Sequence, residues 1–192
     1  MMQASFNTVP TFKTKRLFIR PPKEGDGQAL FESLQTSQNE LAPWLTWVQQ
    51  FKHAGEAEEG VRQAYRDFMQ LKDLRFHLFE LESGSFIGSA GLHEIKWTVP
   101  RMEIGYWLDS RYTGKGYMVE AVQQLISFAF YTLQAHRLEI RCDPKNEKSR
   151  AIAEKLHFQL EAVLIENERC TYGPGFADTC VYSLMASAFK TT

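Results

Sequence analysis

A short glycine-rich turn precedes a long periodic helical segment of the sequence. Residues Arg111 to Gly116 read RYTGKG, and apolar residues then recur every three or four positions from Tyr117 to Leu133. A helix N-terminus presents unpaired backbone N–H groups and a partial positive charge, so such a turn suits a phosphate. The two glycines let the backbone approach a ligand closely, and Lys115 and Arg111 add positive charge at the rim.

The glycine spacing by itself leaves two interpretations open. A P-loop has the pattern GxxxxGK[ST], and a dinucleotide-binding fold has GxGxxG after an early strand. Residues 111–116 match neither pattern. A lone GxG turn before a helix is more often an ordinary turn than a phosphate-binding site. Spacing alone therefore predicts either a phosphate-binding turn or an ordinary one.

Length and composition are typical of one globular domain. The chain has 192 residues, of which 44% are hydrophobic and 23% charged, and we expect a single domain over residues 1–192 with a flexible or loosely packed segment at 1–12. No apolar run is long enough to span a membrane. The N-terminus lacks the features of a secretory signal, so we expect a soluble, cytoplasmic protein that does not bind membranes.

Charge and cysteine content exclude several other classes of protein. The 22 Lys and Arg residues nearly balance the 23 Asp and Glu residues, for a net charge of -1, which argues against direct nucleic-acid binding. Cys142, Cys170 and Cys180 are odd in number and lack CxxC spacing, so we expect neither disulfides nor a metal site.

The periodicity of apolar residues predicts an α+β, or mixed α/β, fold. Two helical stretches, one through Ala29 to Leu34 and one over 56–72, precede most of the strands. The runs 74–81 and 86–95 flank a polar turn and predict a hairpin. The expected element order is β-α-α-β-β-β-α-β-α-β-β, with strands at 16–20, 74–81, 86–95, 101–109, 137–143, 158–166 and 179–185, and later helices at 117–133 and 146–156.

In this context the turn resembles a known signature. RYTGKG at Arg111 to Gly116 is similar to the [RQ]xxGxG acetyl-coenzyme A signature of the GNAT superfamily of N-acetyltransferases. The resemblance extends in order through TKRLFIRPP, LAPWLTW, EIGYWLDSRYTGKGYMVEAV, LEIRCDPKNEKSRAIAEKLHF and ADTCVYSL. These blocks resemble ribosomal-protein N-terminal acetyltransferases, most closely the ribosomal-protein-serine type.

The resemblance implies a fold and a cofactor. The fold is a central, mostly antiparallel twisted sheet with one parallel, splayed strand pair and about four flanking helices. The cofactor is acetyl-CoA, with its diphosphate on the backbone amides of the turn and its pantetheine between the parted strands 102–109 and 137–143. A backbone N–H near Trp107 or Leu108 would polarise the thioester carbonyl. The implied coenzyme-binding residues are Trp107, Leu108, Arg111, Tyr112, Thr113, Gly114, Lys115, Gly116, Tyr117, Asn146 and Ser149.

Three catalytic residues follow from the same resemblance. Ser149 matches the residue that protonates the departing thiolate, and Asn146 matches an asparagine that bonds the pantetheine. Without the resemblance, Asn146 would be interpreted as an ordinary helix cap. Glu168 aligns with the proposed general base of the serine-type enzymes, and Glu103 lies at the other usual position for one. An α-amine, with a pKa near 7.7 to 8.0, needs only a modest base.

Other side chains have competing interpretations. Trp44 and Trp47 lie where the family builds a wall of its acceptor groove, but two aromatics can equally pack a helical corner. Cys142 is a candidate acetyl carrier, although a buried structural thiol and direct transfer are the expected arrangement. We expect a structural role for His93. The sequence departs from the family pattern at His157 and Ala162, where glycine is frequent.

The expected activity is acetyl-CoA-dependent transfer of an acetyl group to a protein N-terminal α-amine, that of a ribosomal protein, by direct attack in a ternary complex. Two alternatives stay open. The acceptor could be a small amine such as a polyamine, an amino sugar or an amino acid, or the chain could be a non-catalytic acyl-CoA-binding module. Either a monomer or a homodimer is compatible with the sequence.

Overall fold

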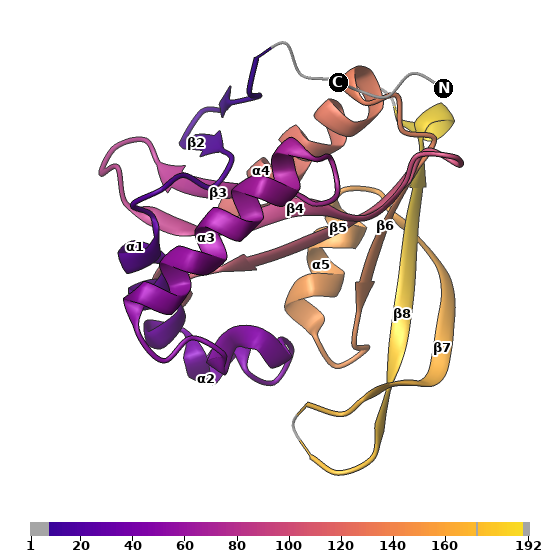
Figure 1. The fold of residues 1–192 in the computed structure, drawn as a ribbon. Coiled ribbons are helices and arrows are strands. Elements are labelled where there is room, and N and C mark those ends of the chain that lie inside the picture. Colours follow the sequence, from indigo (N-terminus) through magenta and orange to yellow (C-terminus); the bar gives the residue numbers. More distant parts are fainter. Residues whose placement is uncertain (1–7, 172, 190–192) are drawn as a thin grey trace.

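The computed structural model describes residues 8–171 and 173–189, which contain an eight-stranded sheet (Figure 1). The strand order is β1-β2-β3-β4-β5-β6-β8-β7. Neighbouring strands are antiparallel except for β5 and β6, which are parallel. The strands are β1 (Phe12–Lys13), β2 (Leu17–Arg20), β3 (Leu74–Glu80), β4 (Phe86–Lys96), β5 (Arg101–Leu108), β6 (Arg137–Cys142), β7 (Gln159–Arg169) and β8 (Phe176–Met185).

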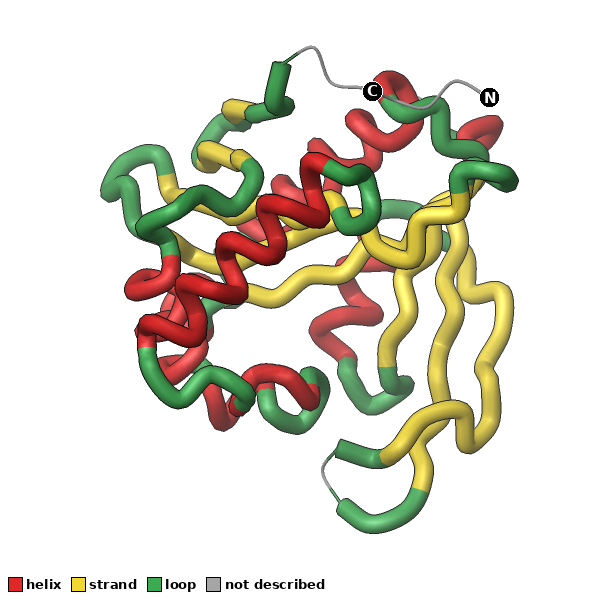
Figure 2. The backbone as a smooth tube through the Cα atoms, in the orientation of Figure 1, coloured by secondary structure: helices red, strands yellow, loops and turns green. Residues whose placement is uncertain are grey.

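Four longer helices and several short ones accompany the sheet (Figure 2). A π-helical turn, η3 (Phe128–Thr132), continues α4, so the helical stretch nearly fills the predicted range 117–133. Within the described ranges, each helix is too short or too polar to cross a membrane. The helices are α1 (Gly27–Thr36), α2 (Gln38–Leu41), α3 (Ala54–Met69), α4 (Tyr117–Ser127) and α5 (Glu147–Lys155), with 3-10 turns η1 (Thr46–Gln49), η2 (Ser110–Tyr112) and η4 (Ala186–Ala188).

Helices pack on both faces of the sheet and form two apolar cores. Ala121, Val122 and Leu125 of α4 are buried against Ile104 and Leu138 of the central strands in the larger core. This burial follows from the three- and four-residue spacing of apolar side chains along α4. The smaller core joins α1 and α3 to the opposite face, with these members: Leu30, Leu34, Val48, Ala57, Val61, Phe86 and Trp107.

The α+β class and the mostly antiparallel sheet with one parallel pair are as the sequence predicts. The hairpin of β3 and β4 is also confirmed. One strand was not predicted, because β1 is only two residues long and too short to show alternation. Phe12 of β1 pairs with Ile19, and its ring lies 5.5 Å from that of Phe76. Of the segment expected to be loose, residues 1–7 lie outside the described residues.

Candidate active site

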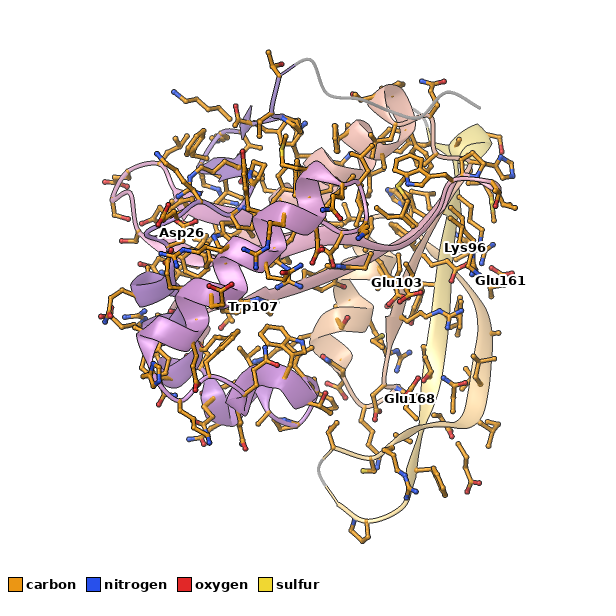
Figure 3. The ribbon with its side chains drawn as sticks, viewed as in Figure 1. Asp26, Lys96, Glu103, Trp107, Glu161 and Glu168 are labelled. Atoms are coloured by element: carbon orange, nitrogen blue, oxygen red, sulfur yellow. The ribbon has the colours of Figure 1, made fainter. Side chains whose placement is uncertain are left out.

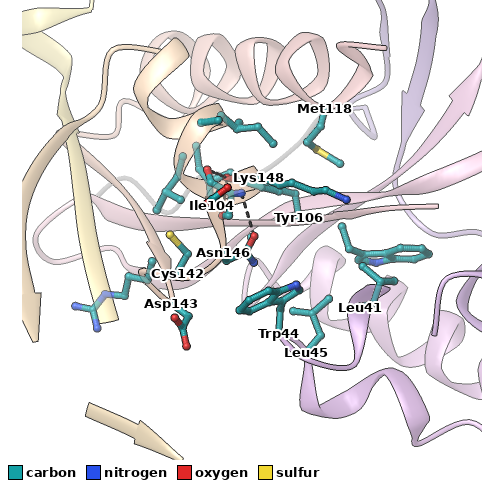
Figure 4. A pocket seen from close by; sticks show the side chains of 18 of the residues that line it. Leu41, Trp44, Leu45, Ile104, Tyr106, Met118, Cys142, Asp143, Asn146 and Lys148 are labelled. Carbon is teal, nitrogen blue, oxygen red and sulfur yellow. Dashed lines mark hydrogen bonds between the residues drawn. The ribbon is translucent and has the colours of Figure 1, made fainter. Parts of the chain in front are cut away.

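A large cleft, with a volume of about 1290 Å³, brings together segments that are far apart in the sequence. It is lined by β5, β6, the starts of α4 and α5, the segment from α2 to Leu45, and the hairpin of β7 and β8. Figure 4 shows Cys142 and Asp143 on one side of the pocket and Leu41, Trp44 and Leu45 on the other. Most of the residues singled out from the sequence line this cleft.

The cleft opens where β5 and β6 part. The two strands pair only from Arg101–Arg137 to Glu103–Glu139, and no later pair joins them in the described part of the chain. The amide of Asp109 donates to the Ile87 carbonyl over 2.8 Å. Because backbone groups alternate sides along an antiparallel strand, the amide of Trp107 then faces β4, and those of Tyr106 and Leu108 face the gap. Of the two amides proposed from sequence, only that of Leu108 points into the cleft.

The glycine turn presents a row of free backbone amides at the start of α4 within the described residues. Gly114 and Gly116 both have left-handed backbones, with φ of 74° and 80°, a conformation that glycine adopts without strain. Within the described residues, no protein group accepts from the six backbone amides of residues 114–119. Successive free amides at a helix start form an anion-binding site.

The first three residues of the signature have a different role. Their amides bond within the turn: that of Arg111 to Asp109 Oδ1 over 2.9 Å, and those of Tyr112 and Thr113 to the carbonyls of Asp109 and Ser110. The Arg111 guanidinium also donates to Asp109, over 2.6 Å at its closest. These three residues therefore shape the turn and leave the free donors to the residues that follow.

Hydrogen bonds with α1 and with Ser37, directly after it, hold this turn in place. Asp109 is fully buried and accepts a 2.7 Å hydrogen bond from the Ser33 hydroxyl. Ser110 donates its amide to the Ser37 hydroxyl over 2.8 Å. Burial acts to raise the pKa of Asp109, but the hydrogen bonds from Arg111 and Ser33 outweigh it and lower the pKa. An ionised carboxylate thus fixes the turn to α1.

Asn146 and Ser149 lie together at the start of α5. Asn146 Oδ1 accepts from the Ser149 amide over 3.1 Å, so Asn146 is the helix cap that its residue type favours, and it also lines the cleft. The Ser149 hydroxyl lies 3.1 Å from the Tyr106 hydroxyl of β5. Burial raises the pKa of Tyr106, which keeps this phenol protonated.

The two candidate bases lie on different strands (Figure 3). Glu103 is the last β5 residue paired with β6, and burial raises the pKa of its carboxyl although Arg141 lies 3.8 Å away. Glu168 is exposed near the end of β7, opposite Ala177 of β8. Both glutamates line the cleft, so the fold leaves both available to the reaction.

Trp44 and Trp47 lie in different environments. Trp44 lines the cleft, whereas the ring of Trp47 packs edge-on against Trp107 at 6.3 Å in the smaller core. Trp47 is not among the cleft-lining residues of the described chain, so its position favours the helical-corner interpretation, whereas that of Trp44 favours the acceptor-groove interpretation. Lys115 also lies outside the lining, with its ammonium 5.3 Å from the centre of the Tyr112 ring.

The described residues of the cleft form neither a metal site nor a reactive thiolate. In the described residues, no three His, Cys, Asp or Glu side chains are grouped to hold a metal ion. Cys142 lines the cleft, and burial raises the pKa of its thiol to about 11. A thiol that stays protonated at neutral pH is a poor nucleophile.

Comparison with known proteins identifies the family. The model described as an acetyltransferase (GNAT) domain matches residues 16–159, which include β2, the glycine turn, Asn146 and Ser149. The chain belongs to the GNAT acetyltransferases. The predicted family, the N-acetyltransferase activity and the acetyl-CoA cofactor are therefore confirmed.

Individual relatives of this GNAT acetyltransferase include proteins named for ribosomal substrates. The chain is 30% identical over 145 residues to the putative ribosomal N-acetyltransferase YdaF of Bacillus subtilis, covering 75% of this chain and 78% of that one. It is 28% identical over 128 residues to the ribosomal-protein-serine acetyltransferase of Escherichia coli, covering 64% and 72%. A ribosomal L7/L12 alpha-N-protein acetyltransferase, solved with coenzyme A, shares the fold with a TM-score of 0.84 at 23% identity, covering 92% and 97%.

Several cleft residues of this GNAT acetyltransferase were missed from the sequence. Tyr106 lies in a β-strand pattern that predicts only burial, and no spacing rule links it to Ser149. Asn167 and Arg169 line the cleft next to the irregular part of β7. The only signal for them was their nearness in sequence to Glu168.

Proposed function

We propose that this GNAT acetyltransferase acetylates the N-terminal α-amine of a ribosomal protein by direct transfer in a ternary complex. The observation that carries the proposal is the presence in one cleft of a donor-rich turn, an opened strand pair, a Tyr–Ser hydroxyl pair and two carboxylates. Each of these suits one requirement of acetyl transfer to an amine.

The free amides of residues 114–119 fit the diphosphate of the coenzyme. This range is shifted by three residues from the range 111–116 expected from sequence, because the amides of Arg111, Tyr112 and Thr113 are already bonded. The backbone groups of Ile104, Tyr106 and Leu108 that face the gap suit an extended pantetheine arm, which would add to β5 like a strand. The Leu108 amide is the proposed donor to the thioester carbonyl.

Acetyl-CoA supplies an activated thioester. The protein must give one proton to the departing sulfur and remove one proton from the amine. Ser149 would donate a proton to the departing sulfur and regain one from solvent after the coenzyme leaves, and Tyr106, whose hydroxyl lies 3.1 Å from that of Ser149, would orient the serine hydroxyl. Because burial raises the pKa of Tyr106, its phenol stays protonated and acts as a hydrogen-bond partner of Ser149. Asn146 holds the helix start that carries Ser149.

Glu168 is the proposed acceptor of the amine proton, directly or through one water. Its exposed position at the outer part of the cleft suits an acceptor that arrives from solvent. Glu103 is the alternative base, since its raised pKa brings it nearer to neutrality. Its contact with Arg141 and its position at the closed end of the strand pair favour a supporting role.

The state of Cys142 supports direct transfer over an acetyl-cysteine intermediate. Its pKa of about 11 leaves almost no thiolate at neutral pH. An acetylated enzyme would require that thiolate to attack the donor. We therefore expect Cys142→Ala to retain activity.

The choice of a protein N-terminus rests on the named relatives and on the acceptor end of the cleft. YdaF and the E. coli enzyme are both named for ribosomal acceptors. Trp44 and Leu45 on one side and Asn167 to Arg169 on the other border this end. These walls come from segments far apart in the chain, and an extended peptide segment would fit between them.

One contact favours a small amine as the second candidate acceptor. The Thr171 hydroxyl, near the tip of the β7–β8 hairpin, donates to the Pro43 carbonyl across the acceptor end of the cleft. A bridge there would restrict long acceptors. A peptide would have to break this contact, whereas a small amine would not.

The deciding experiment is coenzyme A thiol release with a panel of acceptors. The panel contains a peptide that begins with serine, the same peptide with a blocked N-terminus, a polyamine, an amino sugar and free amino acids. Turnover of the free peptide alone supports the proposal, and turnover of a small amine with no peptide activity overturns it. Mass spectrometry of protein N-termini in cells with and without this protein then names the acceptor.

A further inference from the structure

Arg16 connects the N-terminal strands to the glycine turn. It lies between β1 and β2 with its side chain 38% exposed. Its Nη1 donates to the Lys115 carbonyl over 2.8 Å, and its Nε donates to Glu120 Oε2 over 2.7 Å. Its guanidinium also stacks 4.5 Å from the centre of the Tyr117 ring. One side chain from near the N-terminus thus contacts the glycine turn and the first turn of α4.

Glu120 is tightly held in this contact. It accepts from the Arg16 amide over 2.8 Å and from the Thr14 hydroxyl over 2.5 Å. Burial acts to raise the pKa of Glu120, but the hydrogen bonds from Thr14 and Arg16 outweigh it and lower the pKa. The paired carboxylate compensates the charge of Arg16. Arg16 is therefore suited to hold the backbone, and less suited to bind an anion itself.

The contact with Lys115 fixes the direction of a neighbouring amide. The Lys115 carbonyl and the Gly116 N–H belong to the same planar, trans peptide group, in which the two bonds point in opposite directions. Since Arg16 holds the carbonyl on the side of β2, the Gly116 N–H must point to the other side. Gly116 lines the cleft, and its amide has no acceptor within the described residues.

Without Arg16 this peptide group would be less restrained. Gly114 and Gly116, on either side of Lys115, both have positive φ and no side chain to restrict them. Arg16 restrains the Lys115–Gly116 peptide group, which the neighbouring glycines do not restrain. A preorganised donor binds its ligand more tightly because less conformational freedom is lost on binding.

We propose that Arg16 is a positioning residue for the coenzyme, and that it aims the Gly116 amide at the diphosphate by holding the Lys115 carbonyl. This inference rests on the proposed placement of the coenzyme at residues 114–119. It predicts an effect on coenzyme binding, with the chemical step left intact. It also predicts that the effect depends on the diphosphate.

The test compares Arg16→Ala and Arg16→Lys with the unsubstituted protein by calorimetric titration with CoA. We expect Arg16→Ala to weaken CoA binding roughly tenfold, with kcat at saturating acetyl-CoA within about twofold. Arg16→Lys should recover only part of the affinity, because an ammonium lacks the planar fork that bonds Lys115 and Glu120 together. Arg62→Ala is the matched control, since Arg62 is similarly exposed, at 47%, and pairs with Glu24 away from the turn.

A truncated donor separates positioning from general damage. S-Acetylpantetheine lacks the diphosphate, so its kcat/KM should be the same for Arg16→Ala and the unsubstituted protein. Unchanged CoA affinity, or an equal loss with both donors, would overturn the role of Arg16. If the unsubstituted protein itself failed to bind CoA, the proposed function would fail instead, and the two failures are distinguishable.

Discussion

The backbone amide of Glu166 on β7 donates to Asp178 Oδ1 on β8 over 2.9 Å, at a point where the two strands are out of register. Leu164 pairs with Thr179, and the next pair is Glu168 with Ala177, so three β7 residues lie opposite Asp178 alone. In an unbroken ladder, Glu166 would lie opposite Ala177. The irregularity therefore moves Glu168 by two positions into the place that Glu166 would occupy, and Asp178 holds it there.

Asp178 is expected to control activity through this irregularity. Asp178→Ala removes the acceptor for the Glu166 amide, and Glu168 is then less well positioned. We expect kcat to fall between roughly 10- and 100-fold, since small displacements of catalytic groups cost that much. Asp178→Asn keeps a side-chain oxygen and should retain most of the activity. Steady-state kinetics on the three proteins make the comparison.

A substitution at Glu166 should restore part of the kcat that Asp178→Ala loses. The φ of 50° at Glu166 is left-handed, which costs a non-glycine residue about 1 kcal/mol or more. Glu166→Gly should therefore raise the free energy of unfolding and, combined with Asp178→Ala, restore part of kcat. Glu166→Ala removes the same side chain but keeps the strain, so it should do neither. Equal effects of Gly and Ala would contradict the strain explanation.

Ser149 and Tyr106 are expected to act as one unit. Ser149→Ala should lower kcat by roughly 100-fold or more, the contribution of a general acid, with CoA affinity nearly unchanged. Tyr106→Phe keeps the ring and loses only the hydroxyl that lies 3.1 Å from Ser149, so its effect should be smaller. The double variant should be no slower than Ser149→Ala, because Tyr106 acts through the serine. Multiplicative losses would show that the two hydroxyls act separately.

Trp44 and Trp47 should behave differently although they are three residues apart. Trp44→Ala should raise KM for the peptide acceptor and leave the unfolding midpoint nearly unchanged, because Trp44 lines the cleft. Trp47→Ala removes a ring packed on Trp107 and should lower stability by roughly 3 kcal/mol or less, since Trp47 is only partly buried. Thermal unfolding and acceptor kinetics on both variants test this. A stability loss confined to Trp44→Ala would reverse the assignments.

The sequence predicted the elements well because they depend on local periodicity and turn residues. The residues of α4 and the β3–β4 hairpin carry their own signals. The details of the cleft depend on contacts between distant segments, such as Tyr106 with Ser149 or Glu166 with Asp178, and no local pattern encodes them. His157 illustrates the difference, since its φ of 63° is a left-handed conformation that favours glycine, the residue that the family resemblance implied after this helix. The sequence revealed the departure, and only the backbone revealed that the position has a left-handed conformation.

Asp26 at the start of α1 joins β2 and β3 through a buried ion pair outside the cleft. Its carboxylate accepts from Arg20 over 2.6 Å and from His77 Nδ1 over 2.7 Å. Burial acts to raise the pKa of Asp26, but the hydrogen bonds from Arg20 and His77 outweigh it, and the pKa lies well below its ordinary value of 3.8. Burial also lowers the pKa of His77, so its neutral ring donates to the carboxylate.

This shift predicts how stability depends on pH. Because the folded-state pKa of Asp26 is lowered, its contribution is fully present above the unfolded value near 3.8 and is lost as pH falls below it toward the folded pKa. Asp26→Asn should cost about 3–5 kcal/mol at pH 7, since it leaves Arg20 without its charge partner. The difference between the two proteins should shrink from pH 5 to pH 2.5. Urea unfolding at several pH values measures it, with Glu59→Gln as an exposed control that should change little. A difference that stayed constant over this range would mean that the charge of Asp26 contributes nothing and that only its shape is needed.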